Sequence, residues 1–244
     1  MYDVSGRRVA RVLDAELVAD LLLGIEERGA VDRADMILSG YLGSADNAAV
    51  VADFVARAKA RNPALRYCCD PVLGERDRGL FVRADIPPPV GDRLLPLADI
   101  ITPNHFEFEW LCGTTAASVG QVIEAARALM ARGPSTVIIT SAELADTPES
   151  GIETLAVEAS KAWRVCTPRL PISPNGTGDL FAALFVAARV RGLGTPDALS
   201  HAASAIFAVL ERTAARGTGE MRIVESAEGL LNPKRKFEPI AIGG

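Results

Sequence analysis

Segments with a helical spacing of apolar residues alternate with short apolar runs along most of the chain. Apolar residues recur every four positions from Leu13 to Ile25 and predict an amphipathic helix over 12–27. Further helices are predicted over 48–60, 119–132, 180–188 and 196–214, and buried strands over 35–39, 65–69, 98–102 and 136–140. Helices that alternate with buried strands indicate an α/β fold, with a mostly parallel central sheet flanked by helices on both faces.

Two stretches depart from this alternation. Residues 154–158 and 162–167 are typical of an antiparallel pair of strands. Residues 74–89 combine charges with a triple proline, and we expect a loop there apart from a candidate edge strand over 80–82. Neither a repeat nor a second domain is indicated, so we treat 1–244 as one domain.

A glycine turn that leads into an apolar helix is the most informative stretch. Gly176 and Gly178 flank Thr177, and Asp179 follows at once. Glycine lets another group approach the main chain, and the first N–H groups of a helix suit a phosphate. A carboxylate beside such an anion site can act as a base. The alternative is a plain tight loop in which Thr177 or Asp179 is the helix N-cap.

Polar residues follow each predicted parallel strand. Ligands of open α/β sheets bind beyond the carboxyl ends of the strands, so these ends are where a site is expected. They are Ser39-Gly40-Tyr41, Asp70-Pro71, Thr102-Pro103-Asn104 and Thr140-Ser141.

Carboxylates near two of these ends are candidates for a cation site. Asn104 and Glu107 lie three residues apart at the start of a predicted short helix, where they can hold a hydrated Mg²⁺ or form a capping box, or do both. Asp70 and Glu75 are further candidates for the same cation. Their alternatives are a turn-forming role for Asp70 and an exposed loop position for Glu75.

Other polar residues have two interpretations each. The hydroxyls of Thr140 and Ser141 can donate to phosphate oxygens or simply end a strand. Tyr41 can stack on a flat substrate or fill the core. We expect His105 and His201 to lie on the surface or on a helix face without a catalytic role.

The composition of the chain argues against two classes of binding partner, nucleic acids and membranes. A net charge of −5 without a long Lys/Arg run argues against a nucleic-acid surface. No apolar stretch is long enough for a membrane span, and the four cysteines lack metal-site spacing. We therefore expect a cytoplasmic protein that binds neither nucleic acid nor a membrane.

Five motifs occur in the order seen in pyridoxal kinases of the ribokinase-like superfamily, at 39–44, 69–74, 101–107, 137–141 and 176–179. The chain resembles that family over nearly its whole length, from about Gly6 onward. The resemblance implies a ribokinase-like fold and ATP-dependent phosphorylation of the 5′-hydroxymethyl group of pyridoxal, and commonly of pyridoxine and pyridoxamine.

The resemblance also implies roles for particular residues. Asp179 resembles the catalytic base, beside an anion hole formed by the amides of Gly176, Thr177 and Gly178. The implied nucleotide site comprises Asp70, Thr102, Asn104, Glu107, Thr140 and Ser141. The implied Mg²⁺ site comprises Asp70, Glu75 and Glu107, and the substrate lies near Tyr41 and Asp179. ATP and Mg²⁺ are implied, K⁺ is a further candidate cation, and the protein is expected to be a homodimer.

The chain departs from the family pattern at its start and at Glu75, where some members have Asp. Family members begin roughly forty residues earlier with the first strand of the sheet, and without that strand we expect an exposed sheet edge. Two alternatives follow for the function. One is a hydroxymethylpyrimidine-type kinase of the same superfamily, and the other is a non-catalytic remnant that binds a nucleotide or pyridoxal phosphate.

Overall fold

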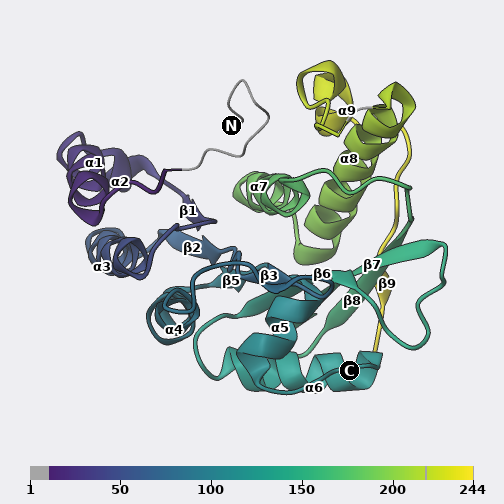
Figure 1. Cartoon of the computed structure of the whole chain (residues 1–244), viewed down its shortest axis with the longest axis horizontal. Coiled ribbons are helices and arrows are strands. Elements are labelled where there is room, and N and C mark those ends of the chain that lie inside the picture. Colours follow the sequence, from purple (N-terminus) through teal and green to yellow (C-terminus); the bar gives the residue numbers. More distant parts are fainter. Residues whose placement is uncertain (1–10, 218, 244) are drawn as a thin grey trace.

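A seven-stranded sheet forms the centre of the molecule in a computed structural model, which describes residues 11–217 and 219–243 (Figure 1). The strand order is β1-β2-β5-β6-β7-β8-β9, and β3 and β4 form a separate two-stranded ladder. The strands are β1 (Met36–Ser39), β2 (Arg66–Cys69), β3 (Gly74–Glu75), β4 (Gly79–Leu80), β5 (Ile100–Ile101), β6 (Thr136–Ala142), β7 (Gly151–Glu158), β8 (Ala162–Pro168) and β9 (Ile240–Ala241).

The sheet has a parallel half and an antiparallel half. β1, β2, β5 and β6 run parallel, whereas β7, β8 and β9 are added in antiparallel fashion. The carboxyl ends of β1, β2, β5 and β6 therefore lie along one border of the sheet. β7 and β8 are the predicted antiparallel pair, and β9 is an element that the sequence pattern did not predict.

Helices cover both faces of the sheet, as expected, with α3, α5 and α6 on one face and α7 and α8 on the other (Figure 1). The helices are α1 (Ala15–Glu27), α2 (Ala30–Arg33), α3 (Ala45–Arg61), α4 (Pro87–Pro89), α5 (His105–Cys112), α6 (Val119–Met130), α7 (Thr177–Val190), α8 (Thr195–Arg216) and α9 (Ala227–Leu231). Short π and 3₁₀ turns complete the set: η1 (Val90–Leu94), η2 (Leu95–Leu97) and η3 (Val224–Ser226). Across the described residues no helix is long and apolar enough to cross a membrane.

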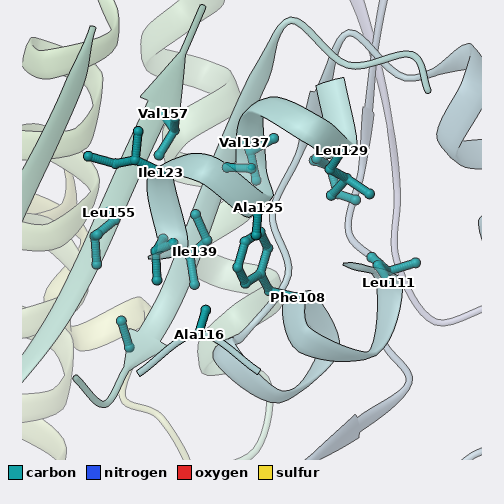
Figure 2. Packing of buried hydrophobic residues seen from close by; sticks show 14 of the residues in the cluster. Phe108, Leu111, Ala116, Ile123, Ala125, Leu129, Val137, Ile139, Leu155 and Val157 are labelled. Atoms are coloured by element: carbon teal, nitrogen blue, oxygen red, sulfur yellow. The ribbon is translucent and has the colours of Figure 1, made fainter. Parts of the chain in front are cut away.

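Successive side chains along the strands belong to two hydrophobic clusters, one on each face of the sheet. In β6, Val137 and Ile139 are buried with Phe108 of α5 and Leu129 of α6, as Figure 2 shows. Ile138 between them belongs to the cluster on the opposite face, under α7 and α8. Successive side chains of a strand point to opposite faces, so a continuous apolar run is the pattern of a strand that is covered on both sides.

The predicted first helix is present as α1, but its apolar stripe is exposed. Leu17 and Leu21 are 42% and 56% accessible, and α1 contains no buried residue. Leu22, on another side of the helix, is the residue that packs against the core formed with α3. The spacing correctly identified an amphipathic helix, and the described part of the chain leaves its apolar stripe uncovered.

The structure also corrects the stretch over 74–97. Instead of a strand over 80–82, Gly79–Leu80 pairs with Gly74–Glu75 in the small ladder. The triple proline forms the helical turn α4 rather than a loop, because the fixed φ of proline suits the first turn of a helix, where no N–H partner is needed. The strand expected over 98–102 is shorter, as β5.

β1 is an edge strand of the described sheet, since β2 is its one described partner. The expected exposed edge is therefore present among the described residues. The opening residues 1–10, on which the expectation of a missing first strand partly rests, lie outside the part of the chain that the structure describes.

Candidate active site

A cavity of about 820 Å³ opens at the carboxyl ends of the parallel strands. It brings together every site residue expected from the sequence. These are Tyr41, Asp70, Glu75, Thr102, Asn104, Glu107, Thr140, Ser141, Gly176, Thr177, Gly178 and Asp179. Segments that are far apart in the sequence thus form one continuous lining.

The amino end of α7 forms one wall of this cavity. Its N-cap is Gly176, which has a left-handed φ of 82°, and no side chain caps the helix. The Thr177 hydroxyl donates instead to the Pro174 carbonyl, at 2.8 Å. The interpretation of this turn as a loop capped by Thr177 or Asp179 is therefore wrong. The first N–H groups of α7 remain available to an anion in the cavity.

Asp179 lies in the first turn of α7, and two glycines, Gly40 and Gly176, lie near its carboxylate in space. A Cβ atom placed on Gly40 would lie 3.3 Å from Oδ1 of Asp179, and one placed on Gly176 would lie 3.7 Å from Oδ2. Gly40 follows β1, so the end of the edge strand lies close to the carboxylate, and a side chain at this position would crowd it. Gly40 is a site residue that sequence reasoning did not identify, although it stands in one of the polar strand ends. The glycines leave the carboxylate exposed to the cavity.

Asp70 is buried at the end of β2 with other acids nearby. Burial raises its pKa to about 8, with further upward contributions from the negative charges of Glu107 and Asp179. Ionisation of this carboxyl group is therefore unfavourable in the ligand-free protein. A cation placed among these acids would favour the ionised form.

Glu107 is held by three backbone donors. Its Oε1 accepts from the N–H groups of Leu73 and Gly74, at 2.7 and 3.2 Å, and its Oε2 accepts from the Asn104 N–H at 2.9 Å. Burial raises the pKa of Glu107, while these hydrogen bonds oppose the rise. The carboxylate thus fixes the loop after β2 to the start of α5.

Asn104 and Glu107 form the capping box that the sequence allowed. Asn104 Oδ1 accepts from the Glu107 N–H at 2.9 Å, and the reciprocal bond is the Asn104 N–H to Glu107 contact. Asn104 Nδ2 also donates to the Gly74 carbonyl at 2.7 Å. Capping does not prevent both residues from lining the cavity, so the two interpretations hold together.

Direct coordination by three carboxylates does not fit the geometry. Over the described residues, no group of three or more His, Cys, Asp or Glu side chains is arranged to hold a metal ion. Glu75 forms an ion pair with Arg78, at 3.3 Å. Mg²⁺ needs only one or two protein carboxylates together with waters and phosphate oxygens, and Asp70 and Glu107 fit that smaller requirement. The buried Thr102 hydroxyl lies beside Asp70 and opposes the rise in the pKa of that carboxyl group.

Tyr41 and Ser141 present their side chains toward solvent at the cavity. Tyr41 is 60% accessible, which makes its interpretation as a core aromatic wrong. Ser141 has a φ of 49° and lies in an irregularity of β6. The Thr140 N–H donates to the Pro103 carbonyl at 2.9 Å, which joins this strand end to the segment before α5.

An apolar wall was not identified from the sequence. α8 contributes Ala203, Ile206, Phe207 and Leu210 to the cavity, beside Phe181 of α7. Their spacing indicated only a buried helix face, because periodicity does not distinguish a core contact from the wall of a cavity. Apolar walls with a few polar groups are the usual setting for a planar ligand ring.

Together, the fold and the site define a kinase of the ribokinase-like class. In this arrangement the amino end of a helix and an adjacent aspartate lie at the carboxyl ends of the parallel strands. Comparison with known proteins agrees with this class. The phosphomethylpyrimidine kinase family model matches residues 10–223. Pyridoxal kinase PdxY of Corynebacterium diphtheriae is 42% identical over 233 residues, which cover 96% of this chain and 82% of that protein. Pyridoxal kinase PdxY of Leifsonia xyli is 44% identical over 93% of this chain and 80% of its own length.

Solved structures show the same fold. Pyridoxal kinase from Leishmania donovani, in complex with ADP and pyridoxamine, aligns with a TM-score of 0.85 and 26% identity, over 98% of this chain and 83% of that chain. Pyridoxal kinase from Entamoeba histolytica aligns with the same TM-score of 0.85 and 23% identity, over 94% of this chain and 81% of that chain. The chain belongs to the pyridoxal kinase family.

Proposed function

We propose that this protein transfers the γ-phosphoryl group of ATP to the 5′-hydroxymethyl group of pyridoxal, and also accepts pyridoxine and pyridoxamine. The observation that carries the proposal is the uncapped amino end of α7, with Asp179 in its first turn, inside a cavity that also holds Asp70 and Glu107. The pyridoxal kinases to which the chain is similar support the choice of substrate.

The proposed reaction follows from the position of Asp179. Its carboxylate takes the proton of the substrate hydroxyl while the hydroxyl oxygen forms a bond to the γ-phosphorus. The bond between that phosphorus and the bridging oxygen of ADP breaks, and ADP leaves. The N–H groups of Thr177 and Gly178 at the amino end of α7 stabilise the charge on the phosphoryl oxygens.

Asp70 and Glu107 would hold the magnesium ion of the nucleotide. Mg²⁺ would supply positive charge to the phosphate oxygens when ATP is bound. Both carboxyl groups are buried next to each other, so they would attract a cation without needing Glu75 as a third ligand. Thr140 and Ser141 would contact the nucleotide, and Tyr41 the pyridine ring, since all three line the cavity. K⁺ is a further cation to be tested.

Formation of pyridoxal 5′-phosphate from pyridoxal and MgATP tests the proposal, with and without K⁺. A hydroxymethylpyrimidine should be assayed in parallel as the acceptor, because the matching family model is that of phosphomethylpyrimidine kinases. We expect a higher kcat/KM for pyridoxal. A preference for the pyrimidine would replace the proposed substrate, and nucleotide binding without transfer to either acceptor would favour the non-catalytic alternative.

A homodimer and a cytoplasmic location complete the proposal. The exposed leucines of α1 offer an apolar surface for a second copy of the chain. The four cysteines, all free, are compatible with a reducing compartment.

A further inference from the structure

Ser141 has an unusual backbone conformation at the cavity wall. It is the one non-glycine residue of the described chain with a positive φ, 49°. β6 and β7 pair regularly up to Ile139 and again at Ala142, so two residues of β6 bulge opposite Thr154. Non-glycine residues adopt this region at a cost, and such conformations persist where surrounding contacts impose them.

Hydrogen bonds on both sides of the bulge tie it to the segment that starts α5. On one side, the Thr140 N–H donates to the Pro103 carbonyl at 2.9 Å. On the other side, the Glu143 N–H donates to Nδ1 of His105 at 3.1 Å. The bulge is thus held at two points by neighbouring residues of one segment, with Ser141 between them.

His105 is suited to hold this position. Its side chain is 3% accessible, and Nε2 lies 2.9 Å from the Ala116 carbonyl oxygen. A carbonyl can only accept, so Nε2 carries the hydrogen and Nδ1 is the acceptor for the Glu143 N–H. Arg76 directs a guanidinium nitrogen at the same Nδ1, at 3.4 Å, which also requires a lone pair there. Glu109 Oε1 lies 3.7 Å from Nε2.

We infer that His105 is a positioning residue for nucleotide binding: its Nδ1 holds the β6 bulge so that Ser141 faces the cavity in the left-handed conformation. The inference rests on the proposed function, in which Thr140 and Ser141 contact ATP. His105 does not line the cavity itself, so it acts through the main chain of Glu143. A surface position for His105 is wrong, because its ring is buried at the start of α5 and links two walls of the site. A positioning role of this kind does not make His105 a catalytic residue.

Two substitutions of His105 distinguish the role of Nδ1 from the role of Nε2. In His105→Asn, the side-chain oxygen can take the place of Nδ1 and accept from Glu143. In His105→Gln, the side-chain amide nitrogen can take the place of Nε2 and donate to Ala116, but no acceptor remains at the position of Nδ1, because the Gln oxygen lies one bond further from the main chain. We expect His105→Gln to raise the KM and Kd for ATP by about tenfold with little change in the KM for pyridoxal, and His105→Asn to stay within about threefold of the parent protein.

Glycine at 141 supplies the decisive comparison, because glycine adopts a positive φ without a steric cost. In a Ser141→Gly background, His105→Gln should raise the KM for ATP by less than about threefold. Glu143→Gln is the matched control, since it weakens the ion pairs of Glu143 with Arg76 and Arg169 but leaves its N–H in place. Amide hydrogen exchange at Glu143 without nucleotide should become faster in His105→Gln and not in His105→Asn.

An equal rise in the KM for ATP with and without Ser141→Gly would overturn the inference, as would equal effects of the Asn and Gln variants. Unchanged exchange at Glu143 in His105→Gln would overturn it as well, whether or not the protein is active. Absence of phosphoryl transfer by the parent protein is a separate result that would count against the proposed function.

Discussion

At the scale of single residues, the site concentrates acidic groups that the ligand-free protein cannot easily keep ionised. Asp70 is the clearest case, because burial and the charges of Glu107 and Asp179 raise its pKa to about 8. Glu107 is partly relieved by three backbone hydrogen bonds, whereas Asp179 is exposed at the helix end. This cluster of carboxyl groups favours the binding of a cation, because a positive charge stabilises their ionised forms.

Asp70→Asn should therefore stabilise the ligand-free protein at alkaline pH. With a folded-state pKa near 8 and an unfolded value near 4, Asp70 binds a proton more tightly when folded, so its contribution to stability is full below about pH 4 and is lost as the pH rises to about 8. We expect the variant to gain about 2 kcal/mol over the parent at pH 8.5, or roughly 4–8 °C in Tm, and little at pH 4.5.

Thermal unfolding of both proteins from pH 4.5 to 9, without Mg²⁺ or nucleotide, measures this difference. The same variant should lose most phosphoryl transfer, because it lacks a carboxylate for the cation. A gain in Tm that is independent of pH would mean that the charge of Asp70 is not the cause.

At the scale of elements, the amino end of α7 differs from those of α1, α3, α5 and α6. Side chains cap α1, α3, α5 and α6, and the last two have full capping boxes. No side chain caps α7, whose N-cap is Gly176, and its amino end lines the cavity. Unsatisfied N–H groups at a helix start are costly unless water or a ligand receives them, so this end is suited to a phosphate.

Gly178→Ala tests the anion site separately from folding. A Cβ atom at Gly178 meets no atom within 4 Å, and the same holds for Gly120, the second residue of α6. Both substitutions should leave stability unchanged or raise it by up to about 1 kcal/mol, because alanine favours the helix. Gly178→Ala alone should weaken ATP binding, by about tenfold, since its methyl group enters the phosphate site.

Titration calorimetry with ATP and thermal unfolding of the two variants provide the comparison. Equal ATP affinity in Gly178→Ala and Gly120→Ala would exclude close approach of a phosphate to this turn.

At the scale of the whole molecule, exposed apolar side chains of α1 lie beside β1, one of the two edge strands of the described sheet. α1 packs on α3 next to the edge strand β1 (Figure 1). Its exposed apolar residues include Leu13, Leu17, Leu21 and Ile25. Contiguous apolar surface of this kind is typical of an interaction site, and a second copy of the chain is the proposed occupant.

Leu17→Glu combined with Leu21→Glu should convert a dimer into a monomer, because both side chains are already half exposed and neither fills the core. Light scattering after size-exclusion chromatography gives the mass of each species. Val224→Glu is the control, since Val224 is 90% accessible outside α1. A dimer that persists in the double variant would move the interface to another surface.

The sequence allowed much of the site to be predicted, for a physical reason. Parallel strands bring their carboxyl ends to one border, so polar residues such as Asp70 and Thr140 could be assigned to a common site before their contacts were known. The proximity of Gly40 to Asp179 could not be predicted, because it joins segments 139 residues apart. The exposure of the apolar stripe of α1 could not be predicted for a related reason: periodicity identifies an apolar face, but not what covers it.

The measurement to make first compares the parent protein with Asp179→Asn, in both phosphoryl transfer to pyridoxal and ATP affinity. Loss of a general base costs about 10²–10⁴-fold in rate, and removal of a charge beside the anion site should leave ATP affinity equal or higher. We predict a fall in kcat of that size with no loss of ATP binding. Transfer at an unchanged rate would contradict the role of Asp179 as the base on which the proposed reaction depends.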